Sequence, residues 1–238
     1  MVADLSKRSF GERYGLTLVI PFGFSLFLTV VAFTPNIGIL FRYYHLPAAG
    51  MEPNYPIGSY VLINRASYGF SAYSYDILKL PIKGRWPDKM PERGDVIVFK
   101  LPRDPTQDYV QRVVGVPGDT IQLKRDWLYL NGQALRRVEA GEAPADSVMG
   151  GGHLPTPLFR ETWPDGSSFI HAEVRGAQGY LADTPIFEVP PRHLFVLGDN
   201  RDNSNDSRSQ PYEYGVGFVP VENIVGKVIL GFGDRDWQ

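Results

Sequence analysis

The sequence predicts a mostly β protein preceded by one transmembrane helix. Three observations carry this prediction. Apolar residues beyond position 42 alternate or cluster in short runs, which is typical of strands. The 25 glycines, 20 prolines and 13% aromatic share suit short strands joined by turns better than a helical bundle. One long segment near the N-terminus is apolar and uncharged, as a membrane span requires.

The membrane candidate is the segment 14–41. No charged side chain occurs from Tyr14 to Phe41, and Leu16–Phe33 is almost wholly apolar. This run has about the length that crosses a bilayer as a helix. A cleaved signal peptide is the alternative, but its apolar region is usually shorter, and no small-x-small cleavage site stands out before Arg42. We therefore predict an anchor over 14–41.

The basic residues around this segment predict its orientation. Lys7, Arg8 and Arg13 precede the apolar run, and only Arg42 follows it closely. The positive-inside rule places residues 1–13 in the cytoplasm. The sequence thus predicts a single-pass protein of the plasma (inner) membrane, with its bulk on the outer, periplasmic or extracellular, side.

The strands are expected after the anchor, separated by turns that contain Pro, Gly and Asn. The predicted strand segments are 59–64, 95–101, 109–116, 120–132, 193–199 and 224–232. The Asn131-Gly132 pair predicts a hairpin. From about 138 to 191 the pattern weakens into Gly, Pro and small polar residues. We therefore predict a core domain over 42–137 and 192–238, with a smaller β lobe inserted at 138–191.

Composition and spacing exclude several function classes. A net charge of −2 without a basic run gives no reason to expect nucleic acid. The absence of cysteine removes disulfides, thiolate zinc sites and a cysteine nucleophile. The four histidines lie far apart, and three aspartates at 199, 202 and 206 miss the spacing of a calcium-binding EF-hand. No metal site or cofactor is predicted.

Three motifs occur in an order that points to one family. They are P-A-A-G-M-E-P at 47–53, Y-V-Q-R-V-V-G at 109–115 and G-D-N-R-D-N-S-N-D-S-R at 198–208. With the anchor upstream, they make the chain resemble signal peptidase I, the membrane-bound serine endopeptidase that removes signal peptides from exported preproteins. The resemblance covers most of the chain and implies a coiled β-sheet fold with a smaller inserted β lobe.

The positions that carry the family's chemistry are substituted. In the register set by Met51, the family nucleophile position holds Gly50, and the position of an upstream serine that helps to line the oxyanion hole holds Ala48. The position of the general base, a lysine in the family, holds Gln111. Buried lysine can serve as a base because burial lowers its pKa, whereas an amide has no useful basicity.

The motif that supports this chemistry in the family is retained. The resemblance implies that Ser204 would hydrogen-bond the base and that Asp206 and Arg208 would pair to hold the loop. It also implies that Met51, Pro53 and Tyr109 contact substrate, and we expect these three to line the peptide site. One departure follows at once, because residues 209–215 stand where many relatives pass almost directly to G-F-V-P.

These observations favour a catalytically silent relative over two alternatives. A groove between the strand leading to Gly50 and the strand carrying Gln111 would bind a signal peptide or preprotein in extended form, or an active signal peptidase would be the partner. The first alternative is an active peptidase with a non-standard nucleophile. The second is a structural membrane protein that binds no peptide. Gly50 has its own alternative explanation, as the glycine that a tight turn requires.

Overall fold

The structure is a computed structural model. It describes residues 25–26, 40–75, 81–143, 156–173, 181–209 and 215–232. The chain divides into two compact units, Met1–Arg42 and Tyr43–Gln238. The predicted anchor lies outside the described residues except for 25–26, which are helical, and 40–41. In the described part of the chain, no helix has the length and hydropathy needed to cross a bilayer.

The prediction of a mostly β fold is confirmed. The principal sheet has seven strands in the order β1-β2-β16-β5-β6-β14-β15. Their bounds are Phe41–His45 (β1), Tyr60–Asn64 (β2), Ile224–Phe232 (β16), Val96–Leu101 (β5), Asp104–Gly115 (β6), His193–Leu197 (β14) and Val219–Pro220 (β15). The strands β2, β16, β5, β6, β14 and β15 pair antiparallel along this order. Five of the seven overlap segments predicted from apolar alternation.

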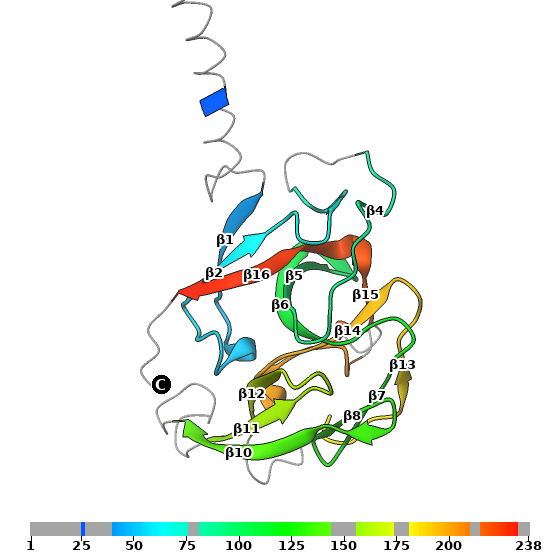
Figure 1. Cartoon of the computed structure of the whole chain (residues 1–238). Coiled ribbons are helices and arrows are strands. Elements are labelled where there is room, and N and C mark those ends of the chain that lie inside the picture. The colour runs from blue at the N-terminus through cyan, green and yellow to red at the C-terminus, as the bar shows by residue number, and fades with distance from the viewer. Residues whose placement is uncertain are drawn as a thin grey trace, which may run out of the picture. The chain divides into compact units, whose positions relative to one another are not determined.

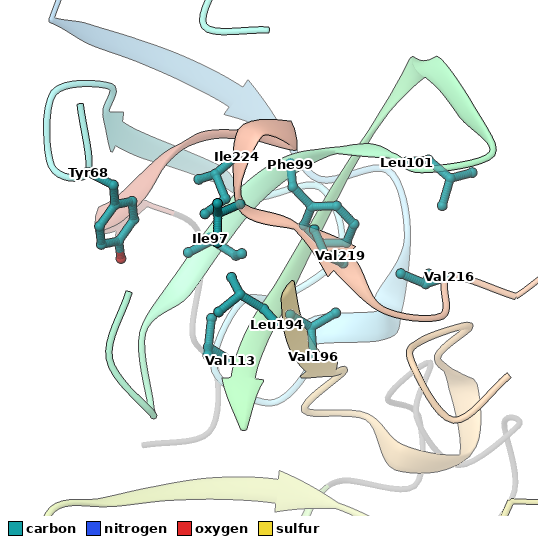
Figure 2. Packing of buried hydrophobic residues seen from close by; sticks show 11 residues of the cluster. Tyr68, Ile97, Phe99, Leu101, Val113, Leu194, Val196, Val216, Val219 and Ile224 are labelled. Carbon is teal, nitrogen blue, oxygen red and sulfur yellow. The ribbon is translucent and has the colours of Figure 1, made fainter. Parts of the chain in front are cut away.

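Strand β5 lies in the hydrophobic core and is covered on both faces. All six of its residues, V-I-V-F-K-L, are buried, so both of its faces are covered. Ile97 and Phe99 lie in one hydrophobic cluster and Val96 and Val98 in another. Figure 2 shows the first cluster, in which side chains from β5, β6, β14 and β16 point toward one another. The core thereby fixes β6, the strand that carries Gln111.

Two smaller sheets complete the larger unit, together with a two-stranded ribbon of β3 (Phe70–Ser71) and β4 (Arg85–Trp86). One has the order β13-β7-β8-β9, with bounds Phe187–Glu188, Thr120–Lys124, Trp127–Leu130 and Gln133–Ala134. Asn131 and Gly132 both have positive φ, 51° and 79°, which is the geometry of a type I′ turn. The predicted hairpin at this pair is confirmed.

The other small sheet consists of β10 (Arg136–Ala143), β11 (Thr156–Thr162) and β12 (Ser168–Ala172), which pair antiparallel. It is drawn at the bottom of Figure 1, on the far side of β14 from β16. Apolar alternation does not mark β10, because half of its eight residues are charged and only Ala143 is fully buried. The boundaries of the inserted lobe, 138–191, stay a prediction.

Candidate functional site

A cleft of about 870 Å³ opens between three segments of the larger unit. The first segment runs from the end of β1 into a short 3₁₀ turn, η2 (Ala49–Met51), and the second is part of β6. The third begins in another 3₁₀ turn, η4 (Arg201–Asn203). The residues that line the cleft are Tyr44, His45, Leu46, Pro47, Ala48, Gly50, Met51, Asp108, Tyr109, Val110, Gln111, Asp202, Asn203, Ser204, Asn205 and Ser209.

The wall that contains Gly50 is held by hydrogen bonds from Asn200. The backbone N–H of Asn200 donates to the carbonyl oxygen of Gly50 at 3.1 Å. The side-chain amide of Asn200 donates to the carbonyl oxygen of Ala49 at 3.2 Å. On the opposite side of the turn, Met51 is only 3% exposed and packs in the hydrophobic cluster with Val98. Gly50 therefore occupies a fixed place beside residues 198–208, here called the support loop.

The backbone at Gly50 accepts a side chain. Its φ is not among the positive values in the chain, so an L-residue suits this conformation. A Cβ atom there would lie 3.5 Å from the carbonyl oxygen of Asn203 and 3.9 Å from Ser204 Oγ, which are ordinary contacts. The turn does not require glycine at position 50.

Gln111 lies across the cleft and is 3% exposed. Its Nε2 donates to Ser204 Oγ at 3.2 Å and to the carbonyl oxygen of Asn205 at 2.7 Å. Its Oε1 has no hydrogen-bond partner among the residues that the structure describes. The fold thus brings Gly50, Gln111 and Ser204 together, although they are far apart in the sequence.

A buried ion pair fixes the loop beyond Ser204. Arg208 Nε and Nη2 donate to the two carboxylate oxygens of Asp206, each at 2.9 Å, and both residues are under 5% exposed. Asp206 also accepts from the backbone N–H of Gly198 at 3.2 Å. Burial by itself lowers the pKa of Arg208, but the neighbouring carboxylate of Asp206 outweighs it and raises the pKa. Arg208 is therefore cationic at any working pH.

The cleft offers few groups able to act as a base. Among its described lining residues there is no Lys or Arg, and the titratable acids are Asp108 and Asp202. The carboxylate of Asp108 is paired with Lys100 at 2.9 Å. Apart from these acids, the lining includes one imidazole, that of His45, whose ring centroid lies 5.1 Å from that of Tyr60.

Comparison with known proteins identifies the family of this chain. Residues 18–232 match the model of the family described as signal peptidase, peptidase S26. The chain belongs to this family. It is 35% identical to signal peptidase I of Rickettsia typhi over 86% of this chain and 76% of that protein. The corresponding values for the enzyme of Rickettsia prowazekii are 34%, 87% and 76%.

One solved signal peptidase I is also similar in structure. It comes from Enterococcus faecalis V583, and its alignment covers 59% of this chain and 98% of that chain. The two are 26% identical, with a TM-score of 0.35.

Most of the residues that the signal peptidase motifs nominate line the cleft. Ala48, Gly50, Met51, Tyr109, Gln111 and Ser204 belong to the lining. Pro53, Asp206 and Arg208 are buried and are not part of the lining. The motifs place these residues in order along the chain, whereas their position in the cleft comes from the sheet.

Sequence reasoning missed three residues that hold this site of the signal peptidase fold. Asn200 fastens the Gly50 turn, as described above. Arg112 makes a two-bond contact with Asp199, with Nε–Oδ1 and Nη2–Oδ2 distances of 2.7 and 2.6 Å. Asn54 Nδ2 donates to Asp199 Oδ2 at 2.7 Å. Arg112 and Asn200 stand inside recognisable motifs, but nothing in the sequence names their partners, and Asn54 has no signal at all.

Proposed function

We propose that this member of the signal peptidase family is catalytically silent and binds signal peptides or preproteins in extended form. The observation that carries the proposal is the composition of the cleft. Ala48, Gly50 and Gln111 offer neither a hydroxyl nor an amine. The contacts around them, from Ser204, Asn205 and Asn200, are in place.

The chemistry expected of the family requires groups that this cleft lacks. A serine nucleophile needs an oxygen at the reacting position and a base within hydrogen-bond reach. Gly50 has no side chain, and the Gln111 amide is neutral at any working pH. Removal of nucleophile and base leaves only the residual rate that binding and oxyanion contacts supply. Ala48 removes one hydroxyl from those contacts as well.

Peptide binding depends on a different feature, an edge of β6. Strand β5 pairs with β6 from Asp104 to Arg112, whereas β14 pairs with it on the other side only at Arg112, Val113 and Gly115. The segment Asp108–Gln111 therefore lines the cleft beyond the end of β14. A bound peptide would add as a strand along this segment, with its side chains alternating between pockets.

We also propose where the protein works and with which partners. The uncharged segment 14–41, preceded by Lys7, Arg8 and Arg13, supports a membrane anchor with the cleft on the outer side of the membrane. A signal peptide presented at that surface, or a preprotein that carries one, is the ligand. An active signal peptidase is the alternative partner.

The test is a binding isotherm with a fluorescent ten-residue peptide that carries an Ala-x-Ala segment. We expect saturable binding in the micromolar range that depends on the peptide sequence. Gly50→Leu places a bulky side chain in the cleft and should abolish binding. Ala134→Leu, at an exposed position on β9, is the matched control and should bind as the wild type does. Absence of saturable binding would instead support a structural role.

A further inference from the structure

Asn54 makes two hydrogen bonds that reach away from its own segment. Its Nδ2 donates to Asp199 Oδ2 at 2.7 Å and to the backbone carbonyl of Ile170, on β12, at 2.6 Å. Asn54 follows Met51 by three residues and is not itself part of the cleft lining. Any effect that it has on a ligand must therefore act through other residues.

Asp199 connects Asn54 to the opposite wall. Its carboxylate is 1% exposed and accepts both Nε and Nη2 of Arg112, at 2.7 and 2.6 Å. Arg112 directly follows Gln111 and also donates to the carbonyl oxygen of Gly94 at 2.8 Å. One carboxylate thus holds the strand of Gln111 and, through Asn54, the segment that carries Gly50.

The buried carboxylate of Asp199 needs a hydrogen-bond donor at position 54 in addition to Arg112. An ionised buried carboxylate needs hydrogen bonds to all of its lone pairs that water does not reach. Arg112, from β6, is the cation that faces Asp199. Tyr55 and Asp95 also lie near Arg112, and against the lowering effect of burial each helps Asp199 to raise the pKa of its guanidinium. The neutral amide of Asn54 supplies a further donor. An ionised acid of the same shape would supply none and would repel Asp199.

We propose that Asn54 is a positioning residue for peptide binding, which by donating to Asp199 ties the Gly50 turn to β6 and sets the separation of the two walls. This rests on the proposed function, because it concerns the affinity of the same cleft. Asn54 contacts no ligand. It determines whether Gly50 and Gln111 stand at the distance that an added strand requires.

The test uses Asn54→Asp, which changes one amide nitrogen to oxygen. At about pH 8, two carboxylates then face each other, and we expect peptide affinity to fall about tenfold. The neighbouring charge raises the pKa of the new carboxyl above its ordinary value of about 3.9. As pH falls through that raised pKa, the single O–H of the protonated carboxyl can donate to Asp199, while the carbonyl of Ile170 stays without the donor that Asn54 supplies. Affinity should therefore recover most of that loss near pH 5, without reaching the wild-type value.

Asn131→Asp is the matched control, because Asn131 Nδ2 also donates to an aspartate, Asp119 Oδ1, at 3.0 Å, in a hairpin outside the cleft lining. It should change peptide affinity less than about twofold at either pH. Asn54→Ala removes the same donor without adding charge and should weaken binding at both pH values. Affinities are measured well below each variant's melting temperature, so that loss of fold does not count as loss of binding.

Three outcomes decide between the possibilities. A pH-dependent affinity confined to Asn54→Asp supports the positioning role. Peptide binding that is equal in wild type, Asn54→Asp and Asn54→Ala overturns that role and leaves the proposed function standing. Absence of peptide binding by the wild type overturns both.

Discussion

Gly50, which lines the cleft, and Gly198, which packs against Ser204 and Gly50, differ in what a methyl group would meet. At Gly50 a Cβ atom makes ordinary contacts, the nearest at 3.5 Å. At Gly198 it would lie 2.1 Å from Ser204 Oγ and 2.6 Å from the carbonyl oxygen of Gly50. Ser204 and the Gly50 turn can therefore pack against position 198 only because that residue is glycine. At position 50, by contrast, the surroundings leave room for a side chain.

This contrast predicts opposite results for two alanine substitutions. Gly50→Ala should leave the free energy of unfolding unchanged or raise it by about 0.5 kcal/mol, because alanine restricts the unfolded chain. Gly198→Ala should lower it by about 1–3 kcal/mol, because Ser204 and the Gly50 turn must move. Urea denaturation of both variants measures the difference. Equal stability of the two variants would contradict the packing described for Gly198.

At this scale the sequence predicted residues through motifs and missed them where no motif exists. The register of Met51 pointed to Gly50 and the third motif to Ser204, and both residues line the cleft. Asn54 could not be found in this way, because a single asparagine is compatible with any turn. Its importance appears only when the fold brings Asp199 to within 2.7 Å.

Among the larger elements, the loop after β14 depends on one buried ion pair. Asp206 and Arg208 are almost inaccessible to water and satisfy each other through two hydrogen bonds. Loss of one partner leaves an uncompensated buried charge, which is much more costly than loss of an exposed pair.

Asp206→Ala should therefore lower the free energy of unfolding by about 3–5 kcal/mol. Asp88→Ala is the control, since Asp88 pairs with Arg192 at 2.5 Å while both side chains are nearly half exposed. That variant should change stability by less than about 1 kcal/mol. Chemical denaturation of both proteins gives the comparison. A small effect of Asp206→Ala would show that the loop is held by other contacts.

Strands whose residues show an apolar pattern could be predicted from the sequence, whereas strands without such a pattern could not. The segments 95–101 and 224–232 became β5 and β16 with ends shifted by at most one residue. Strand β10 escaped prediction because its sequence, R-R-V-E-A-G-E-A, is largely exposed and is held by pairing with β11. Such a strand depends on its neighbour, which no local pattern reveals.

In the whole molecule, Arg137 on β10 joins the two smaller sheets. Glu173, just after β12, contacts Arg137 Nη2, and Arg137 Nη1 donates to the carbonyl oxygen of Asp126, between β7 and β8, at 3.2 Å. Burial raises the pKa of Glu173 to about 7; Arg137 opposes this shift, and Asp126 adds to it. The folded protein therefore holds a proton at this junction over a pH range in which the unfolded chain has released it.

This predicts a loss of stability as pH rises from about 4.5 to about 7 at this site. In that window the folded state binds more protons than the unfolded state, so the free energy of unfolding falls with rising pH. Glu173→Gln removes the titration and should melt at a temperature that depends less on pH. Thermal melts of both proteins between these values measure the slopes. Identical slopes would exclude Glu173 as the source.

The sequence was sufficient to predict the fold class and the family. It was not sufficient to predict where the inserted lobe begins and ends. Composition and alternation predicted the mostly β fold, and three motifs predicted the signal peptidase family. The limits of the inserted lobe, 138–191, depend on pairings between distant segments, such as Phe187 with Ile121, which composition does not encode.

We propose above that this member of the signal peptidase family binds peptides in its cleft and does not cleave them. Mass spectrometry of a preprotein incubated with the wild type and with the variant Ala48→Ser/Gly50→Ser/Gln111→Lys tests it most directly. We expect an intact preprotein with the wild type and cleavage after a small-x-small site with the variant, because position 50 admits a side chain and a lysine at position 111 could reach Ser204 and Asn205. Cleavage at that site by the wild type would contradict the account.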